Sequence, residues 1–122
     1  MKKWIKFVAT LLTAIYAFAG VASAQEMRVC KIGTGGTGGT YYPIGGLIAN
    51  AISNPPGSRP CDKGGSCGVP NLVAIAVSTT ASVFNANAIQ AGSLDAGLAG
   101  AQTVVQSYNG EGKFVDNKTD KI

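Results

Sequence analysis

The chain has 122 residues, of which 46% are hydrophobic and only 13% are charged, and it contains no histidine. Its net charge of +4 depends on three lysines within the first six residues, and the other seven basic residues face six acids. From residue 25 onward the net charge is therefore +1, which gives no clustered basic face for nucleic acid. The lack of histidine also removes the most frequent general base and a common zinc ligand.

The first 24 residues have the pattern of a bacterial signal peptide. Three lysines precede an apolar stretch over residues 7–21, and the small residues Ala22-Ser23-Ala24 follow it. Because this stretch is shorter than the roughly 20 residues of a membrane span, an uncleaved anchor is the weaker alternative. We expect cleavage before Gln25 and a mature protein in the periplasm.

The mature sequence opens with a predicted strand, a glycine-rich loop and a helix. Residues 28–32 form a short strand, and residues 33–42 then interleave glycine with threonine. The helix is expected to start near Pro43, since proline is favoured in the first helical turn. Its larger apolar residues recur at helical spacing and predict one buried face: Ile44, Leu47, Ile48, Ala51 and Ile52.

Two of the three cysteines bracket a short segment within a loop over residues 58–70. Cys61 and Cys67 flank Asp62-Lys63-Gly64-Gly65-Ser66, and exported proteins meet oxidising conditions, so we expect a Cys61–Cys67 disulfide. Two thiolates without histidine do not complete a zinc shell, so we expect no metal. Cys30 lies in an apolar run, where we expect a buried, inert thiol.

The next segment predicts a second strand and a second helix. Residues 72–77 are continuously apolar, as in a parallel strand that is buried on both faces. The hydroxyl-rich turn at 78–82 follows, with Ser82 as the expected N-cap of a helix over residues 83–91.

A third strand over residues 94–99 and a third helix over residues 101–109 complete the pattern, and Gly110 is expected to close that helix. The β-α-β-α-β-α order predicts an α/β fold with a parallel sheet. Ligands of such sheets bind at the carboxyl ends of the strands. Three loops rich in small polar residues meet that edge: 33–42, 78–82 and 99–103.

The glycine-rich loop has more than one possible meaning. Gly33, Gly35 and Gly38 fit the dinucleotide pattern G-x-G-x-x-G, but no acid lies between Arg28 and Cys61 to hold a ribose. A turn that only permits tight strand–helix packing is one alternative. The other is an anion or amide site built from backbone N–H and hydroxyl donors. We expect no cofactor and no enzymatic activity, because no nucleophile–base pair is evident.

Three sequence blocks together resemble a known family. The first runs from Gly33 to Gly46, the second from Ser82 to Asp95, and the third from Ala101-Gln102 through Tyr108-Asn109-Gly110. In this order they are similar to the TAXI proteins, the solute receptors of tripartite ATP-independent periplasmic (TRAP) transporters. The resemblance extends over about residues 29 to 114.

The TAXI resemblance implies a periplasmic-binding-protein-like receptor whose two α/β lobes close on a ligand and deliver it to a TRAP-type membrane permease. It implies a small organic anion or amino acid as the ligand, with glutamate or a dicarboxylate as examples. Carried onto this sequence, the ligand-binding positions lie in the three loops: Thr34, Gly36, Thr37, Tyr41, Thr79, Thr80, Ser82 and Gln102.

The chain departs from the family pattern in its second turn and in its length. Thr80-Ala81 stands where many relatives carry paired glycines. Two lobes need roughly 300 residues, so we expect a truncated receptor with part of one lobe. The expected division is a signal peptide over 1–24, a partial lobe over 25–114 and a polar tail over 115–122. An exported interaction domain, or a degenerate domain without ligand binding, is the alternative.

Overall fold

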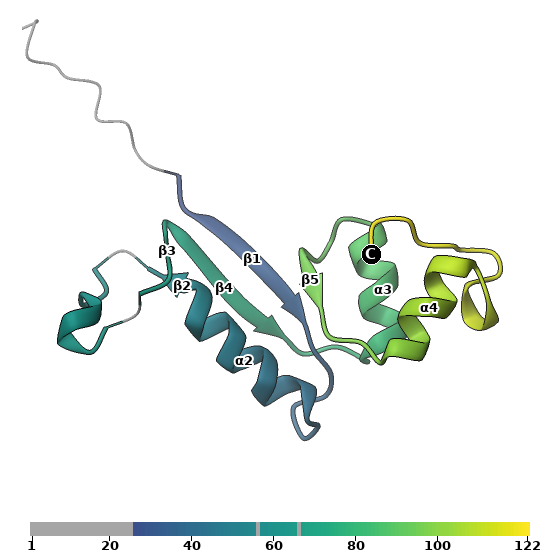
Figure 1. The fold of residues 1–122 in the computed structure, drawn as a ribbon, viewed down its shortest axis with the longest axis horizontal. Helices are drawn as coiled ribbons and strands as arrows, with labels where there is room; N and C mark the ends of the chain where they lie inside the picture. The colour runs from purple at the N-terminus through teal and green to yellow at the C-terminus, as the bar shows by residue number, and fades with distance from the viewer. Residues whose placement is uncertain (1–25, 56, 66) are drawn as a thin grey trace, which may run out of the picture.

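A three-stranded parallel sheet organises the structure, a computed structural model that describes residues 26–55, 57–65 and 67–122 (Figure 1). The predicted signal peptide lies outside these residues. The strand order is β4-β1-β5, with β1 at Arg28–Gly33, β4 at Leu72–Val77 and β5 at Ala96–Gly97. The predicted α/β fold with parallel strands is confirmed.

The central strand β1 aligns its two neighbours. It pairs with β4 along its whole length, from Arg28↔Leu72 to Gly33↔Val77, but with β5 only at Ile32↔Ala96 and Gly33↔Gly97. The third strand is therefore shorter than the predicted span of 94–99.

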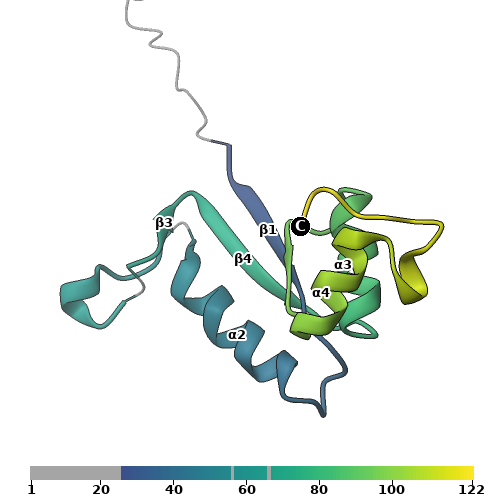
Figure 2. The same ribbon diagram turned by 45° about the vertical axis from the view of Figure 1, so that its right-hand side comes forward.

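Each main strand is followed by a helix, as the alternating sequence pattern predicts. α2 spans Tyr41–Ile52, α3 spans Ser82–Gln90 and α4 spans Ala101–Asn109. α2 covers one face of the sheet, whereas α3 lies beside β5 with α4 next to it (Figures 1 and 2). No helix in the described part of the chain is long and apolar enough to cross a bilayer.

α2 packs on the sheet through its small residues. Gly45 and Ala49 are buried, and Ala49 joins Ile32 and Ala74 in the core cluster. A side chain at Gly45 would overlap Cγ2 of Thr34, so the helix lies too close to the sheet for larger residues. The predicted buried face is therefore wrong except for Ile52, which packs against the core. The larger residues remain exposed: Ile44 41%, Leu47 72% and Ile48 38%.

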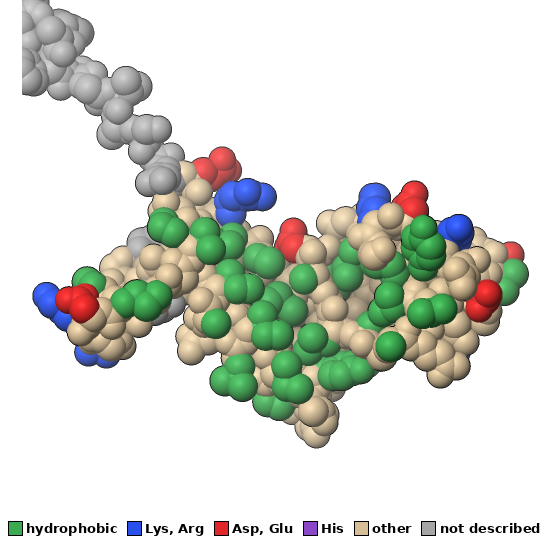
Figure 3. All heavy atoms as spheres, viewed as in Figure 1, with side chains coloured by type: hydrophobic (Ala, Val, Ile, Leu, Met, Phe, Trp, Pro, Cys, Tyr) green, Lys and Arg blue, Asp and Glu red, His purple; other side chains and the backbone are tan. Residues whose placement is uncertain are grey.

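The second face of β4 lacks a covering helix among the described residues. Ile75 is 42% exposed, and Val29 on β1, two residues before the register partner of Ile75, is 54% exposed. α3 instead lies over Gly33 and Gly97, where a Cβ would meet Asn85 of that helix. The prediction that residues 72–77 are buried on both faces is therefore wrong. Hydrophobic side chains accordingly show on the surface over the middle of the molecule (Figure 3).

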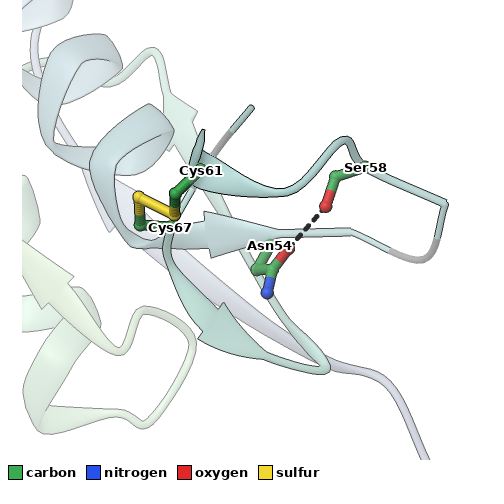
Figure 4. The surroundings of a disulfide bond; sticks show 4 residues. All are labelled: Asn54, Ser58, Cys61 and Cys67. Carbon is green, nitrogen blue, oxygen red and sulfur yellow. Dashed lines mark hydrogen bonds between the residues drawn. A yellow bond between two sulfur atoms is a disulfide. The ribbon is translucent and has the colours of Figure 1, made fainter. Parts of the chain in front are cut away.

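The segment between α2 and β4 leaves the sheet and returns beside its starting point. β2 at Ser53–Asn54 pairs in parallel with β3 at Val69–Pro70. Between them, the predicted disulfide joins Cys61, at the start of the 3-10 helix η1 (Cys61–Lys63), to Cys67 (Figure 4). Cys30 is a free thiol that is only half-buried, at the margin of the core.

The end of the chain is held against α3 and α4. The 3-10 helix η2, Gly112–Phe114, buries Phe114 completely. The backbone N–H of Thr119 donates to the carbonyl oxygen of Ser107 at 2.9 Å, and the N–H of Asp120 donates to Oε1 of Gln90 at 3.0 Å. The segment has the polar composition that the sequence indicates, and it belongs to the packed structure.

Replacing Gly45 with alanine should destabilise the fold by about 2 kcal/mol, because the added methyl group would force α2 away from Thr34 and the sheet. The matched control is Gly46→Ala, one residue along the same helix, where a Cβ meets nothing within 4 Å. That change should stabilise the fold by about 0.5–1 kcal/mol through helix propensity. Urea unfolding measures both variants, and equal effects would contradict the close packing of Gly45.

Candidate functional site

The three loops at the carboxyl edge of the sheet are brought together by direct hydrogen bonds. The backbone N–H of Thr79 donates to the carbonyl oxygen of Gly35 at 3.3 Å, which joins the second loop to the first. The N–H of Gly100 donates to Oγ of Ser82 at 3.0 Å, which joins the third loop to the second. The segments that the strand-end argument selects therefore form one surface.

The side chain of Asn85 ties the ends of all three strands together. It is fully buried on α3, and its Nδ2 donates to the carbonyl oxygens of Thr34 and Leu98, each at 2.8 Å. Its Oδ1 accepts from Oγ1 of Thr79 at 2.8 Å. Sequence analysis missed Asn85, because a single amide on a short helix does not reveal which distant carbonyls it will meet.

A small pocket of about 260 Å³ lies where the glycine-rich loop meets the second turn. Tyr41 forms one wall, and a Cβ added at Gly35 would sit 3.6 Å from Cβ of both Tyr41 and Ala81. The Tyr41 hydroxyl reaches across to the third loop, 3.9 Å from where a Cβ on Gly100 would lie. The predicted positions Gly36 and Tyr41 line this pocket, together with residues that the prediction omitted: Gly35, Gly39, Thr40 and Ala81.

The helices α2, α3 and α4 begin near this pocket without a side-chain cap. No hydroxyl or carboxylate caps α2, α3 or α4, and none of them carries an acid in its first turn. The N–H groups of a first helical turn have no partner inside the helix and carry partial positive charge. The expected N-cap role of Ser82 is wrong, because Ala81 occupies that position and Ser82 bonds to Gly100.

Two of the predicted ligand-binding hydroxyls serve the loops themselves. Thr34 is completely buried, and its Oγ1 donates to the carbonyl oxygen of Val77 at 2.7 Å. Oγ1 of Thr79 accepts from the N–H of Ala81 at 3.0 Å and donates to Asn85. Burial keeps Thr34 out of reach of a ligand, and Thr79 holds the second turn in shape.

The remaining predicted positions are more accessible. Thr37, Thr80 and Gln102 are exposed, and Ser82 is half-buried. Thr80 and Ser82 line a second pocket, whereas Thr37 and Gln102 line neither of the two pockets. Among the described residues, no group of three or more His, Cys, Asp or Glu side chains could hold a metal ion.

A family model described as the NMT1-like family matches residues 32–122. The match covers about three quarters of the chain and includes all three loops. The chain belongs to the NMT1-like family. This family is periplasmic-binding-protein-like, and its members are typically non-enzymatic solute-binding domains. The loop pocket of this NMT1-like chain lies at the carboxyl edge of its parallel sheet.

Ala81 holds the second turn in an unusual backbone conformation. Its φ of 72° and ψ of −147° lie in a region that L residues rarely adopt and that glycine adopts freely. The conformation turns the chain from β4 into α3 and places the Ala81 methyl group in the loop pocket. This NMT1-like chain thus has a strained residue between Thr80 and Ser82, two of the predicted ligand-binding positions.

Asn85→Ala should destabilise this NMT1-like chain by about 3 kcal/mol, because the carbonyl oxygens of Thr34 and Leu98 would lose a buried donor. The control is Asn87→Ala on the same helix, where the side chain makes an exposed bond to Asn117. Asn87→Ala should lower the free energy of unfolding by less than about 1 kcal/mol. Chemical denaturation compares the two, and a loss below 1 kcal/mol at Asn85 would show that its amide is not required.

Ala81→Gly should stabilise the chain by about 1 kcal/mol, because relief of strain exceeds the added entropy of the unfolded glycine. Ala91→Gly is the matched control, since Ala91 has an ordinary φ of −76° after the same helix. The free energy of unfolding of Ala91→Gly should fall by about 0.5–1 kcal/mol. Thermal melting reads out both, and destabilisation by Ala81→Gly would contradict the backbone strain.

Proposed function

We propose that this chain captures a small organic anion or amino acid, such as glutamate or a dicarboxylate, as a periplasmic receptor for a TRAP-type permease. The observation that carries the proposal is the meeting of three uncapped helix starts around the glycine-rich loop, with no acid in their first turns. Such N–H groups attract a carboxylate, and the absence of nearby acids leaves that attraction unopposed.

The lining of the loop pocket suits one small polar ligand. Its volume of about 260 Å³ lies just below the 300–1,000 Å³ of typical drug-sized sites. Gly36 allows close approach to the backbone, and the Tyr41 hydroxyl offers a donor or an acceptor at the opposite wall. Thr37, Thr80, Ser82 and Gln102 belong to the surrounding loops without lining this pocket, while Thr34 and Thr79 fix the loops.

The transporter partner rests on the TAXI resemblance of the three sequence blocks. Membership in a solute-binding family supports the broader role of ligand capture. Delivery to a membrane permease would also require a surface that binds the permease, and the described residues do not identify one.

Thermal melting with glutamate and with succinate tests the proposal. A ligand at a hundred times its Kd should stabilise the protein by about 2.7 kcal/mol. Gly36→Val should abolish this shift by filling the pocket, and it should fold normally because a Cβ there meets nothing within 4 Å. Gly38→Val is the matched control: it is equally open but does not line the pocket. A shift that survives Gly36→Val would place the ligand elsewhere.

A second candidate function is an exported interaction domain without a ligand. The exposed apolar row on α2 favours it, with Leu47 at 72% exposure as its most accessible member. Sedimentation at increasing protein concentration separates the two functions. Association that grows with concentration, together with no melting shift from any of the anions, would favour the interaction domain.

A further inference from the structure

A second and larger pocket lies between α3 and η2. It measures about 640 Å³ and shares no lining residue with the loop pocket. It combines hydroxyls, an amide, an apolar wall and one cation, and its lining residues are Thr80, Ser82, Val83, Phe84, Asn87 and Lys113.

The fold holds Lys113 in this position. The next residue, Phe114, is completely buried and anchors η2. The N–H of Phe114 donates to the carbonyl oxygen of Glu111 at 3.0 Å, which closes the turn around Lys113. Nδ2 of Asn117 donates to Oδ1 of Asn87 at 2.8 Å and ties the following turn to α3. These contacts fix the backbone of Lys113 beside α3, and Lys113 lines the pocket there.

The neighbouring lysines are engaged differently. Nζ of Lys118 lies 5.4 Å from the centre of the Tyr108 ring, and Nζ of Lys121 donates to the carbonyl oxygen of Gln90 at 3.0 Å. Among the described residues that line the second pocket, Lys113 is the only charged one. An anion in this pocket would consequently meet one cation and no acid.

The apolar wall decides what kind of anion fits. Phe84 is 49% exposed although it lines this pocket, and Val83 lines the pocket as well. An aromatic residue and a lysine that line one pocket suit a ligand that has an apolar body and a charged end. A fully polar dicarboxylate would leave Phe84 uncovered.

We propose that this pocket is a second small-molecule site, which binds a monocarboxylate with an aromatic body. The carboxylate pairs with Nζ of Lys113 and accepts from the hydroxyls of Thr80 and Ser82, while the ring packs on Phe84. The site is independent of the loop pocket, and it stands whether or not the loop pocket binds glutamate.

Calorimetric titration of the purified full chain with phenylacetate tests the second site. Lys113→Met should weaken phenylacetate binding about tenfold through loss of a charge-assisted bond. Lys118→Met is the matched control and should leave the affinity unchanged. Acetate should bind more weakly than phenylacetate, because it lacks the ring that covers Phe84.

Three outcomes would overturn the proposal: no measurable binding of phenylacetate, equal losses in the two lysine variants, or loss of phenylacetate binding in Gly36→Val. The last result would assign the ligand to the loop pocket. Phenylacetate binding that survives Gly36→Val, in a variant that has lost its glutamate response, would support two separate sites. Failure of glutamate binding in the unaltered chain bears only on the proposed receptor function.

Discussion

The buried amide of Asn85 is the interaction on which the arrangement of the carboxyl edge depends. Parallel strands end at one edge, but nothing in strand pairing fixes the path of the chain beyond the last ladder bond. Asn85 supplies that restraint by bonding to Thr34 and Leu98, each one residue after its strand, and to Thr79, two residues after β4. A buried polar group that is fully paired in this way specifies one geometry, because any other leaves its donors unsatisfied.

Glycines on the neighbouring strands leave space for the Asn85 side chain. A Cβ at Gly33 or at Gly97 would collide with Asn85, so both strands present bare backbone to α3. Gly45 allows the same closeness between α2 and Thr34 on the opposite face of the sheet. The glycines of this chain therefore serve two purposes: some bring the helices close to the sheet, and others, such as Gly36, leave open space at the loop pocket.

Local sequence patterns predict much of this fold, but they do not predict which residues an individual side chain contacts. The apolar run at 72–77 and the helix at 101–109 match the observed elements, since strand and helix periods are local properties. The hydrophobic pattern does not predict which face of α2 packs on the sheet. The close approach of Gly45 to Thr34 determines that face, and hydrophobicity does not. Asn85 and Lys113 escape prediction for a related reason: Asn85 bonds to residues that are distant in the sequence, and Lys113 lines a pocket with such residues.

The pairing of β2 with β3 makes the disulfide-bearing segment between them structurally independent of the main sheet. Because Ser53 lies opposite Val69, the chain leaves and re-enters the domain at neighbouring points. The excursion between them projects away from the sheet at the end opposite α3 and α4 (Figure 1). Its length and composition can therefore vary without altering the register of β1 and β4. The segment is a natural place for sequence insertions, and a peptide epitope grafted there would be displayed far from both pockets.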